Sequence, residues 1–128
     1  MISGKIPKEI GQLSKLGYLD LSSNQFSGDI PAEIGELSKL LKLILKDNEL
    51  SGEVSARIER LSNLESLDLS INMLGGLIPD QIGDCWKLQS LYLSKNYLNG
   101  IIPDQIGNLR ALQDLDLSSN SLMGGIPP

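Results

Sequence analysis

An asparagine recurs every 24 residues along this chain, without a slip from one end to the other. Each one lies in the frame L-x-x-L-x-L-x-x-N-x-L-x-G-x-I-P, of which LESLDLSINMLGGLIP is one copy. A fixed period of roughly 20–30 residues is typical of solenoids, in which each repeat forms one turn of a coil. We therefore predict a single solenoid domain over 1–128, built from a partial repeat 1–12, repeats 13–36, 37–60, 61–84 and 85–108, and an incomplete repeat 109–128. The asparagines are Asn24, Asn48, Asn72, Asn96 and Asn120.

The apolar residues of the frame predict a shared core. The L-x-L step alternates with period two, so its leucines point to one side of a short strand. Parallel stacking of successive strands, about 4.8 Å apart, aligns equivalent leucines into columns. The predicted inward columns include Leu19, Leu43, Leu67, Leu91 and Leu115; Phe26, Leu50, Leu74, Leu98 and Leu122; and Ile30, Val54, Ile78, Ile102 and Ile126.

The polar and special residues of the frame have structural roles in this interpretation. An asparagine amide offers two donors and two acceptor lone pairs, so we expect a ladder that satisfies backbone groups on its own turn and the next. The glycines at 28, 52, 76, 100 and 124 are expected to relax the backbone after the strand. The prolines at 7, 31, 79, 103 and 127 suit an extended segment, because they fix φ and lack an N–H. In the second full repeat Ser55 replaces the proline and Glu59 replaces a recurring glycine.

Composition excludes several functions. The chain contains no histidine, which removes Ser-His-Asp and Cys-His mechanisms and histidine metal ligands. It has no phosphate-binding glycine loop and no kinase motif set. Asp20, Asp68 and Asp116 would lie about 10 Å apart in alternate strands, but the L-D-L-S consensus already explains them. We therefore predict no catalytic, cofactor-binding or metal site, and a chain that is not an enzyme.

Charge and hydropathy argue against two further kinds of partner, nucleic acid and the interior of a membrane. The net charge of −5 and the isoelectric point near 4.6 argue against nucleic acid, which attracts basic proteins. No run approaches the roughly 18 apolar residues of a membrane span.

Cys85 is the single cysteine and stands in the column of Leu37 and Leu61. We interpret it as a buried thiol that packs as a hydrophobe; the alternative is a reactive or intermolecular cysteine.

The half-repeat N-x-L-S-G-x-I-P covers the whole chain in five in-phase copies and resembles the plant-specific class of leucine-rich repeats. That class occurs in plant receptor-like kinases, receptor-like proteins and polygalacturonase inhibitors. The runs LSKLGYLDLSSN and LSNLESLDLSIN are most similar to receptor-kinase ectodomains. The resemblance implies an α/β-type repeat solenoid: a right-handed coil with a parallel β-sheet on the concave face, 3₁₀ or helical turns on the convex side, and an extra short strand in the I-P half.

The chain departs from such ectodomains in ways that affect its interpretation. They usually carry a signal peptide, a paired-cysteine cap, a membrane helix and a kinase, and this sequence has none of these and no N-x-S/T sequon. We expect a fragment of a longer receptor, whose plasma-membrane location and kinase activity would belong to the parent protein. A standalone chain would be expected to associate with itself through its uncapped ends.

Ligand contacts are predicted on the concave face, which carries the residues between the leucines. The resemblance implies a protein or peptide ligand and a co-receptor ectodomain as partners. Exposed apolar and aromatic residues beside lysines suit a peptide with hydrophobic and acidic groups. Two alternatives stay open: a soluble binding protein of the polygalacturonase-inhibitor kind, and a structural spacer within a longer array. The candidate contacts are the outward residues that break the repeat consensus: Tyr18, Lys42, Ile44, Lys46, Ile71, Met73, Tyr92, Lys95 and Tyr97.

Overall fold

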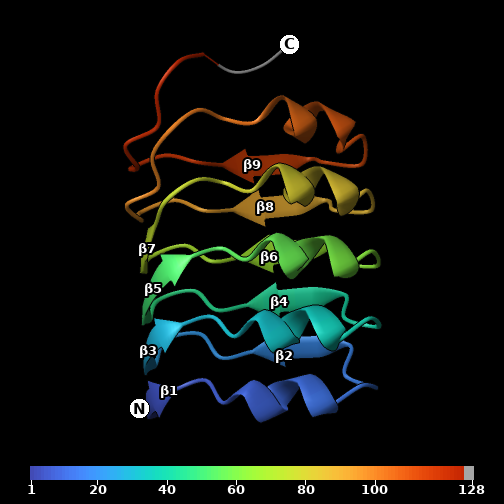
Figure 1. Cartoon of the computed structure of the whole chain (residues 1–128), viewed down its shortest axis with the longest axis vertical. Coiled ribbons are helices and arrows are strands. Elements are labelled where there is room, and N and C mark those ends of the chain that lie inside the picture. Colours follow the sequence, from blue (N-terminus) through green and yellow to red (C-terminus); the bar gives the residue numbers. More distant parts are fainter. Residues whose placement is uncertain (126–128) are drawn as a thin grey trace.

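The protein, described here as a computed structural model over residues 1–125, is a stack of similar turns. Each turn runs through a strand of one sheet, a strand or bridge of a second sheet and a short 3₁₀ helix (Figure 1). The strands are β1 (Ser3–Lys5), β2 (Tyr18–Asp20), β3 (Gln25–Asp29), β4 (Lys42–Ile44), β5 (Glu49–Glu53), β6 (Ser66–Asp68), β7 (Met73–Gly75), β8 (Ser90–Tyr92) and β9 (Asp114–Asp116).

The larger sheet is parallel and joins β2, β4, β6, β8 and β9 in that order. Its register matches the sequence period, because Leu43 pairs with Leu67 and Leu67 with Leu91. Each strand has only three residues, and the central leucine points inward between two outward neighbours, as the period-two pattern predicts. The predicted leucine columns are therefore confirmed.

The second sheet is also parallel and joins β1, β3, β5 and β7. Its register is offset from the sequence period, because Gly28 pairs with Leu50 and Gly52 with Leu74, 22 residues apart. Beyond β7 the ladder continues as two isolated bridges, Leu77 to Asn99 and Ile101 to Met123. The extra short strand implied by the family resemblance is present, with a stagger that the sequence does not reveal.

All helices within residues 1–125 are five-residue 3₁₀ helices, so the helical side of the predicted α/β solenoid contains 3₁₀ turns alone. In four of them the preceding residue is an extended proline with φ between −73° and −64°. Ser55 replaces the proline before the third helix, and its hydroxyl oxygen accepts a hydrogen bond from the Arg57 N–H at 3.1 Å. The helices are η1 (Lys8–Gln12), η2 (Ala32–Glu36), η3 (Ala56–Arg60), η4 (Asp80–Asp84) and η5 (Asp104–Asn108).

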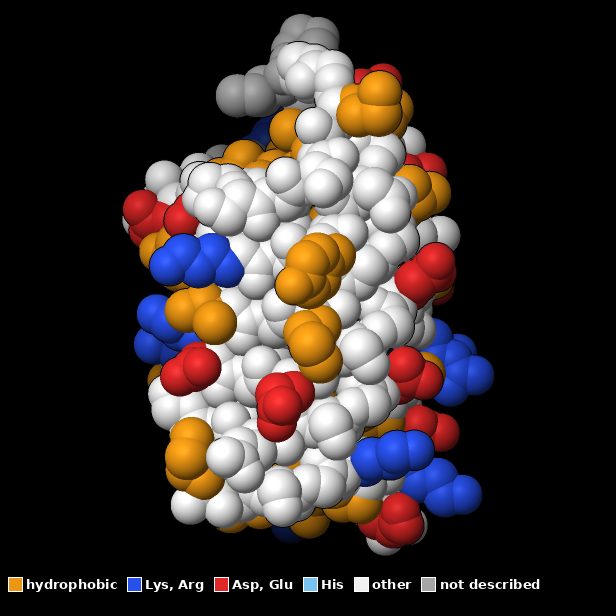
Figure 2. Space-filling model, turned by 90° about the vertical axis from the view of Figure 1, so that its left-hand side faces the viewer, with side chains coloured by type: hydrophobic (Ala, Val, Ile, Leu, Met, Phe, Trp, Pro, Cys, Tyr) orange, Lys and Arg blue, Asp and Glu red, His pale blue; other side chains and the backbone are white. Residues whose placement is uncertain are grey.

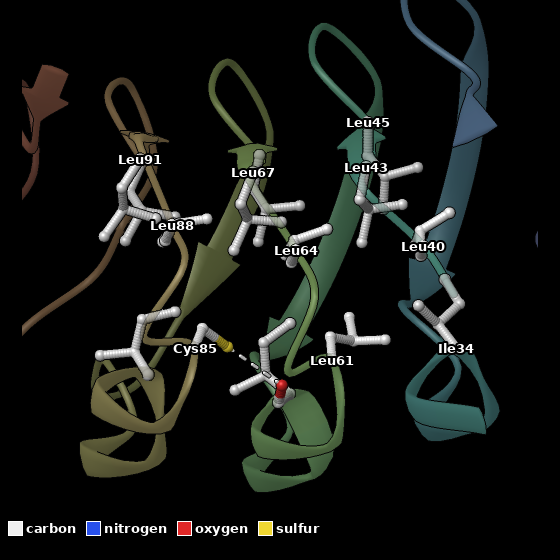
Figure 3. Packing of buried hydrophobic residues seen from close by; sticks show 14 of the residues in the cluster. Ile34, Leu40, Leu43, Leu45, Leu61, Leu64, Leu67, Cys85, Leu88 and Leu91 are labelled. Atoms are coloured by element: carbon white, nitrogen blue, oxygen red, sulfur yellow. Dashed lines mark hydrogen bonds between the residues drawn. The ribbon is translucent and has the colours of Figure 1, made fainter. Parts of the chain in front are cut away.

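The core lies between the two sheets and the 3₁₀ helices. Its leucines and isoleucines stack directly over their counterparts in the adjoining turns (Figure 3). The columns are sealed in the middle and open at the ends, where Leu13 is 51% and Leu115 is 40% exposed. The predicted positions Ile126 and Pro127 lie outside the described residues.

The asparagine ladder is present as predicted. The Oδ1 atom of Asn72 accepts a hydrogen bond from the Leu50 N–H of the preceding turn at 3.0 Å. Its Nδ2 atom donates to the carbonyls of Leu45, Leu69 and Ser70 at 3.0, 3.1 and 3.2 Å. Among the described residues no buried side-chain nitrogen or oxygen lacks a partner. The repeated asparagine therefore supplies hydrogen bonds to buried backbone groups once per turn.

A small cavity of about 30 Å³ lies between the second and third 3₁₀ helices, lined among others by Val54, Ile34 and Leu69. Val54 occupies the column in which Ile30, Ile78 and Ile102 stand elsewhere, so the missing methyl accounts for part of this space. We expect Val54→Ile to raise the free energy of unfolding by up to about 0.8 kcal/mol, the value of one buried methylene. Chemical denaturation measures this, and a lowered midpoint would mean that the space cannot accept the methyl.

Cys85 is fully buried, and its thiol donates to the Ile58 carbonyl oxygen across 3.2 Å (Figure 3). Burial in the apolar core, with a smaller contribution from nearby Asp84, raises its pKa from 9.0 to about 12. We expect iodoacetamide at about pH 8 to leave the native protein unlabelled, because the thiolate is the nucleophile, and to label it in denaturant. Rapid native labelling, read by mass spectrometry, would restore the alternative of a reactive cysteine.

Candidate binding surface

The outer face of the larger sheet carries the first group of predicted contacts. Tyr18 and Lys42 are direct neighbours in the sheet, and so are Ile44 and Asp68. The Lys42 ammonium lies 5.5 Å from the centre of the exposed Tyr18 ring, within the range of a cation–π interaction. Because all these side chains alternate with buried leucines, the strand pattern forces them to the solvent side.

A shallow depression crosses the same face further along the solenoid. It is lined by one ammonium group, two carboxylates, two hydroxyls and one tyrosine ring. This mixture can bind a ligand that carries charged groups and one aromatic or aliphatic side chain. The lining residues are Lys46, Asp68, Ser70, Tyr92, Ser94 and Asp116.

The carboxylates of this face are tied to serines of their own turn. Asp116 accepts hydrogen bonds from the Ser118 hydroxyl at 2.6 Å and from the Ser118 N–H at 3.0 Å. Asp20 does the same with Ser22, at 2.6 and 2.9 Å. These bonds, the hydroxyl first, lower the pKa of both carboxyl groups. The face therefore keeps these negative charges at mildly acidic pH.

Four predicted contacts lie in or beyond the turn that follows each strand of the larger sheet. Ile71 and Lys95 have left-handed backbone, with φ of 55° and 56°, in the turn that follows the strand. Met73 begins β7, and Tyr97 bonds through its N–H to the Leu74 carbonyl, so both belong to the side of the second sheet. The prediction that placed all nine residues on one strand face is thus wrong for Met73 and Tyr97, whereas Ile71 and Lys95 lie in the turn at the edge of that face. The physical reason is the length of the strand, which has only three residues.

Other exposed apolar side chains were not among the predicted contacts. Leu77 and Ile101 occupy the variable position of the G-x-I-P segment, and Trp86 follows η4. The Lys87 ammonium lies 5.1 Å from the centre of the Trp86 ring and donates to Asn63 Oδ1 at 2.9 Å. Other repeats carry charged or serine residues at the equivalent positions. Comparing the repeats position by position would therefore have identified these exposed apolar side chains from the sequence.

Residues 1–125 contain no cluster of three or more histidine, cysteine, aspartate or glutamate side chains able to hold a metal ion. Within the same part of the chain, no helix has the length and apolar character that crossing a membrane requires.

Two leucine-rich-repeat sequence models match residues 15–37 and 62–122, together more than half of the chain. A comparison with curated protein sequences gave no match. Many solved structures are similar.

One is the leucine-rich-repeat ectodomain of the Arabidopsis thaliana membrane receptor kinase GASSHO1/SCHENGEN3 in complex with CASPARIAN STRIP INTEGRITY FACTOR 2. It is 43% identical, with a TM-score of 0.95 over 98% of this chain and 15% of that chain. Another is the Arabidopsis receptor kinase HAESA in complex with the peptide hormone IDA and the co-receptor SERK1. It is 36% identical, with a TM-score of 0.90 over 94% of this chain and 20% of that chain.

A third similar structure is a chain of the BIR3–SERK2 complex from Arabidopsis thaliana. It is 44% identical, with a TM-score of 0.82 over 85% of this chain and 58% of that chain. This chain therefore spans about a fifth or less of the first two proteins and somewhat more than half of the third. The repeat frame, the two parallel sheets and these matches establish that the chain belongs to the leucine-rich-repeat family and is similar to the ectodomains of plant receptor kinases.

Proposed function

We propose that this chain is a non-enzymatic, protein- or peptide-binding segment of the extracellular part of a plant receptor. The outer face of the larger sheet would bind the ligand, and signalling would belong to other parts of the protein. The observation that supports this most strongly is the grouping of non-consensus side chains on that face, where Tyr18, Lys42, Ile44, Lys46 and Tyr92 interrupt a serine and aspartate background. Similar chains in known structures belong to receptors solved with peptide ligands.

The dimensions of the face favour an extended ligand. Five strands about 4.8 Å apart span roughly 20 Å, which an extended peptide of about six residues would cover. Tyr18 on β2 and Tyr92 on β8 lie three strands apart along that span. A peptide with an apolar or aromatic residue at each end and an acidic group toward Lys42 or Lys46 fits this arrangement.

Selection of random displayed peptides on the 128-residue chain tests the proposal. Peptides that bind this face should lose affinity at least about tenfold on Tyr92→Ala and on Lys42→Ala, the loss expected for an interface anchor. Glu36→Ala is the matched control, because Glu36 is exposed at the end of η2, away from both sheets. Enriched peptides that bind all three variants equally, or no enrichment at all, would reject this face as a ligand site and favour the spacer alternative.

A further inference from the structure

The outer face of the second sheet changes character halfway along the solenoid. One row of outward residues begins with Lys5, Asp29 and Glu53 and continues with Leu77 and Ile101. A second row changes in the same two repeats, from Gln25 and Glu49 to Met73 and Tyr97. Figure 2 shows this face, with hydrophobic side chains standing on its upper part and an acidic side chain below them.

We name Met73, Leu77, Tyr97, Ile101 and Met123 the lateral patch. Their exposed fractions run from 46% for Met73 to 68% for Met123. Five large apolar side chains with this exposure lie on neighbouring turns, and exposed apolar surface gathered in this way usually marks an interaction site. Nothing in the core requires them to be apolar, because Asp29 and Glu53 occupy the equivalent positions of Leu77 and Ile101 in earlier repeats.

Side chains in the row that contains Leu77 rest on the backbone of the following turn. Leu77 lies directly over Gly100, just as Glu53 lies over Gly76. Gly100 has a φ of +75° and no Cβ. The Leu77 side chain occupies the space that a side chain at position 100 would need. A side chain resting on a neighbouring backbone has less rotamer freedom to lose on binding, which lowers the entropic cost of association. Between Leu77 and Ile101 a cleft opens toward the 3₁₀ helices.

Carboxylates border the lateral patch on two sides. Glu49 and Glu53 precede it on β5, and Asp80 and Asp104 line the cleft between Leu77 and Ile101. From residue 25 to 125 the outward positions of the second sheet carry no lysine or arginine. The border therefore attracts positive charge next to an apolar surface.

We propose that the lateral patch docks a basic, apolar segment of a second protein, separately from the ligand face of the larger sheet. The segment would place aliphatic or aromatic side chains between Leu77 and Ile101 and direct lysine or arginine toward the acidic border. A second copy of this chain fits poorly, because its net charge of −5 would bring like charges together. An anionic lipid surface is disfavoured for the same reason.

The test uses the same random peptide library on the full 128-residue chain and on the double variant Leu77→Glu/Ile101→Glu. The variant should fold normally, because Asp29 and Glu53 occupy the same repeat position in two earlier repeats. An unchanged thermal midpoint would check this. We expect enriched peptides that combine apolar residues with lysine or arginine and lose affinity at least about tenfold on the variant. Since the variant adds negative charge, that loss would report apolar contact rather than weaker attraction.

Further variants and measurements separate the outcomes. Glu53→Lys should weaken the same peptides and leave those that depend on Tyr92 unaffected, whereas Ser27→Glu, on the same face outside the lateral patch, should change neither. Peptides that respond to Tyr92→Ala alone would overturn the lateral proposal while supporting the ligand face. Concentration-dependent dimerisation abolished by the double variant, or binding to phosphatidylserine vesicles, would assign the patch to a second copy or to lipid and also overturn it.

Discussion

Replacing Leu67 with alanine is expected to lower the free energy of unfolding by about 3–5 kcal/mol. Leu67 is fully buried at the centre of β6, and the register places Leu43 and Leu91 directly on either side of it. The substitution would therefore open a cavity shared by three turns, and backbones held in parallel register on both sides cannot close it easily. Urea denaturation followed by circular dichroism measures the loss.

Leu115→Ala is the matched control, because Leu115 occupies the same column in β9 and is 40% exposed. We expect it to cost about 1 kcal/mol or less, since much of its apolar surface already contacts water. Equal losses at the two positions would contradict the view that burial between neighbouring turns holds the solenoid together.

Replacing Asn72 with alanine is expected to cost about 2–3 kcal/mol, because a buried N–H loses its acceptor and several hydrogen bonds disappear. The two leucine carbonyls involved are less affected. Leu45 O also accepts from Asn48, and Leu69 O also accepts from Asn96. The deficit is thus concentrated at the Leu50 N–H.

Hydrogen exchange can locate that deficit. In the Asn72→Ala variant the Leu50 amide should exchange faster than its neighbours, whereas the Leu74 amide, held by Asn96, should keep its local protection. Asn24→Ala is the control, because its side chain accepts from the exposed Ile2 N–H, and it should cost less than about 1 kcal/mol. An unchanged denaturation midpoint for Asn72→Ala would refute the ladder as a source of stability.

The 24-residue period was sufficient to predict the repeat architecture and the buried columns. Each turn must present equivalent apolar residues to its neighbours, so the leucine positions and the asparagine ladder follow from the pattern. The glycines predicted to relax the backbone do adopt left-handed conformations, with φ from +71° to +78° between Gly28 and Gly124. The period predicts these features because equivalent residues in every repeat pack against equivalent residues of the neighbouring turns.

The candidate site was less predictable because its limits depend on where strands end. Ser23, Asp47, Ile71, Lys95 and Ser119 share a left-handed turn position with φ between 55° and 62°, yet none of them is a glycine or asparagine that would mark it. The period-two interpretation was therefore extended past the end of the strand, and Met73 and Tyr97, which follow this turn, were assigned to the wrong surface. The stagger of the second sheet was equally hidden, because the backbone path between the sheets sets it rather than the repeat length.

The ladder bonds also give the solenoid a direction. In each turn the asparagine Oδ1 accepts from an N–H located 22 residues earlier in the chain, as Asn72 does for Leu50 and Asn96 does for Leu74. During synthesis, a turn would leave the ribosome with that N–H still unmatched and would be completed only when the following asparagine emerged. Folding from the first turn onward would thus proceed with each newly made repeat finishing its predecessor.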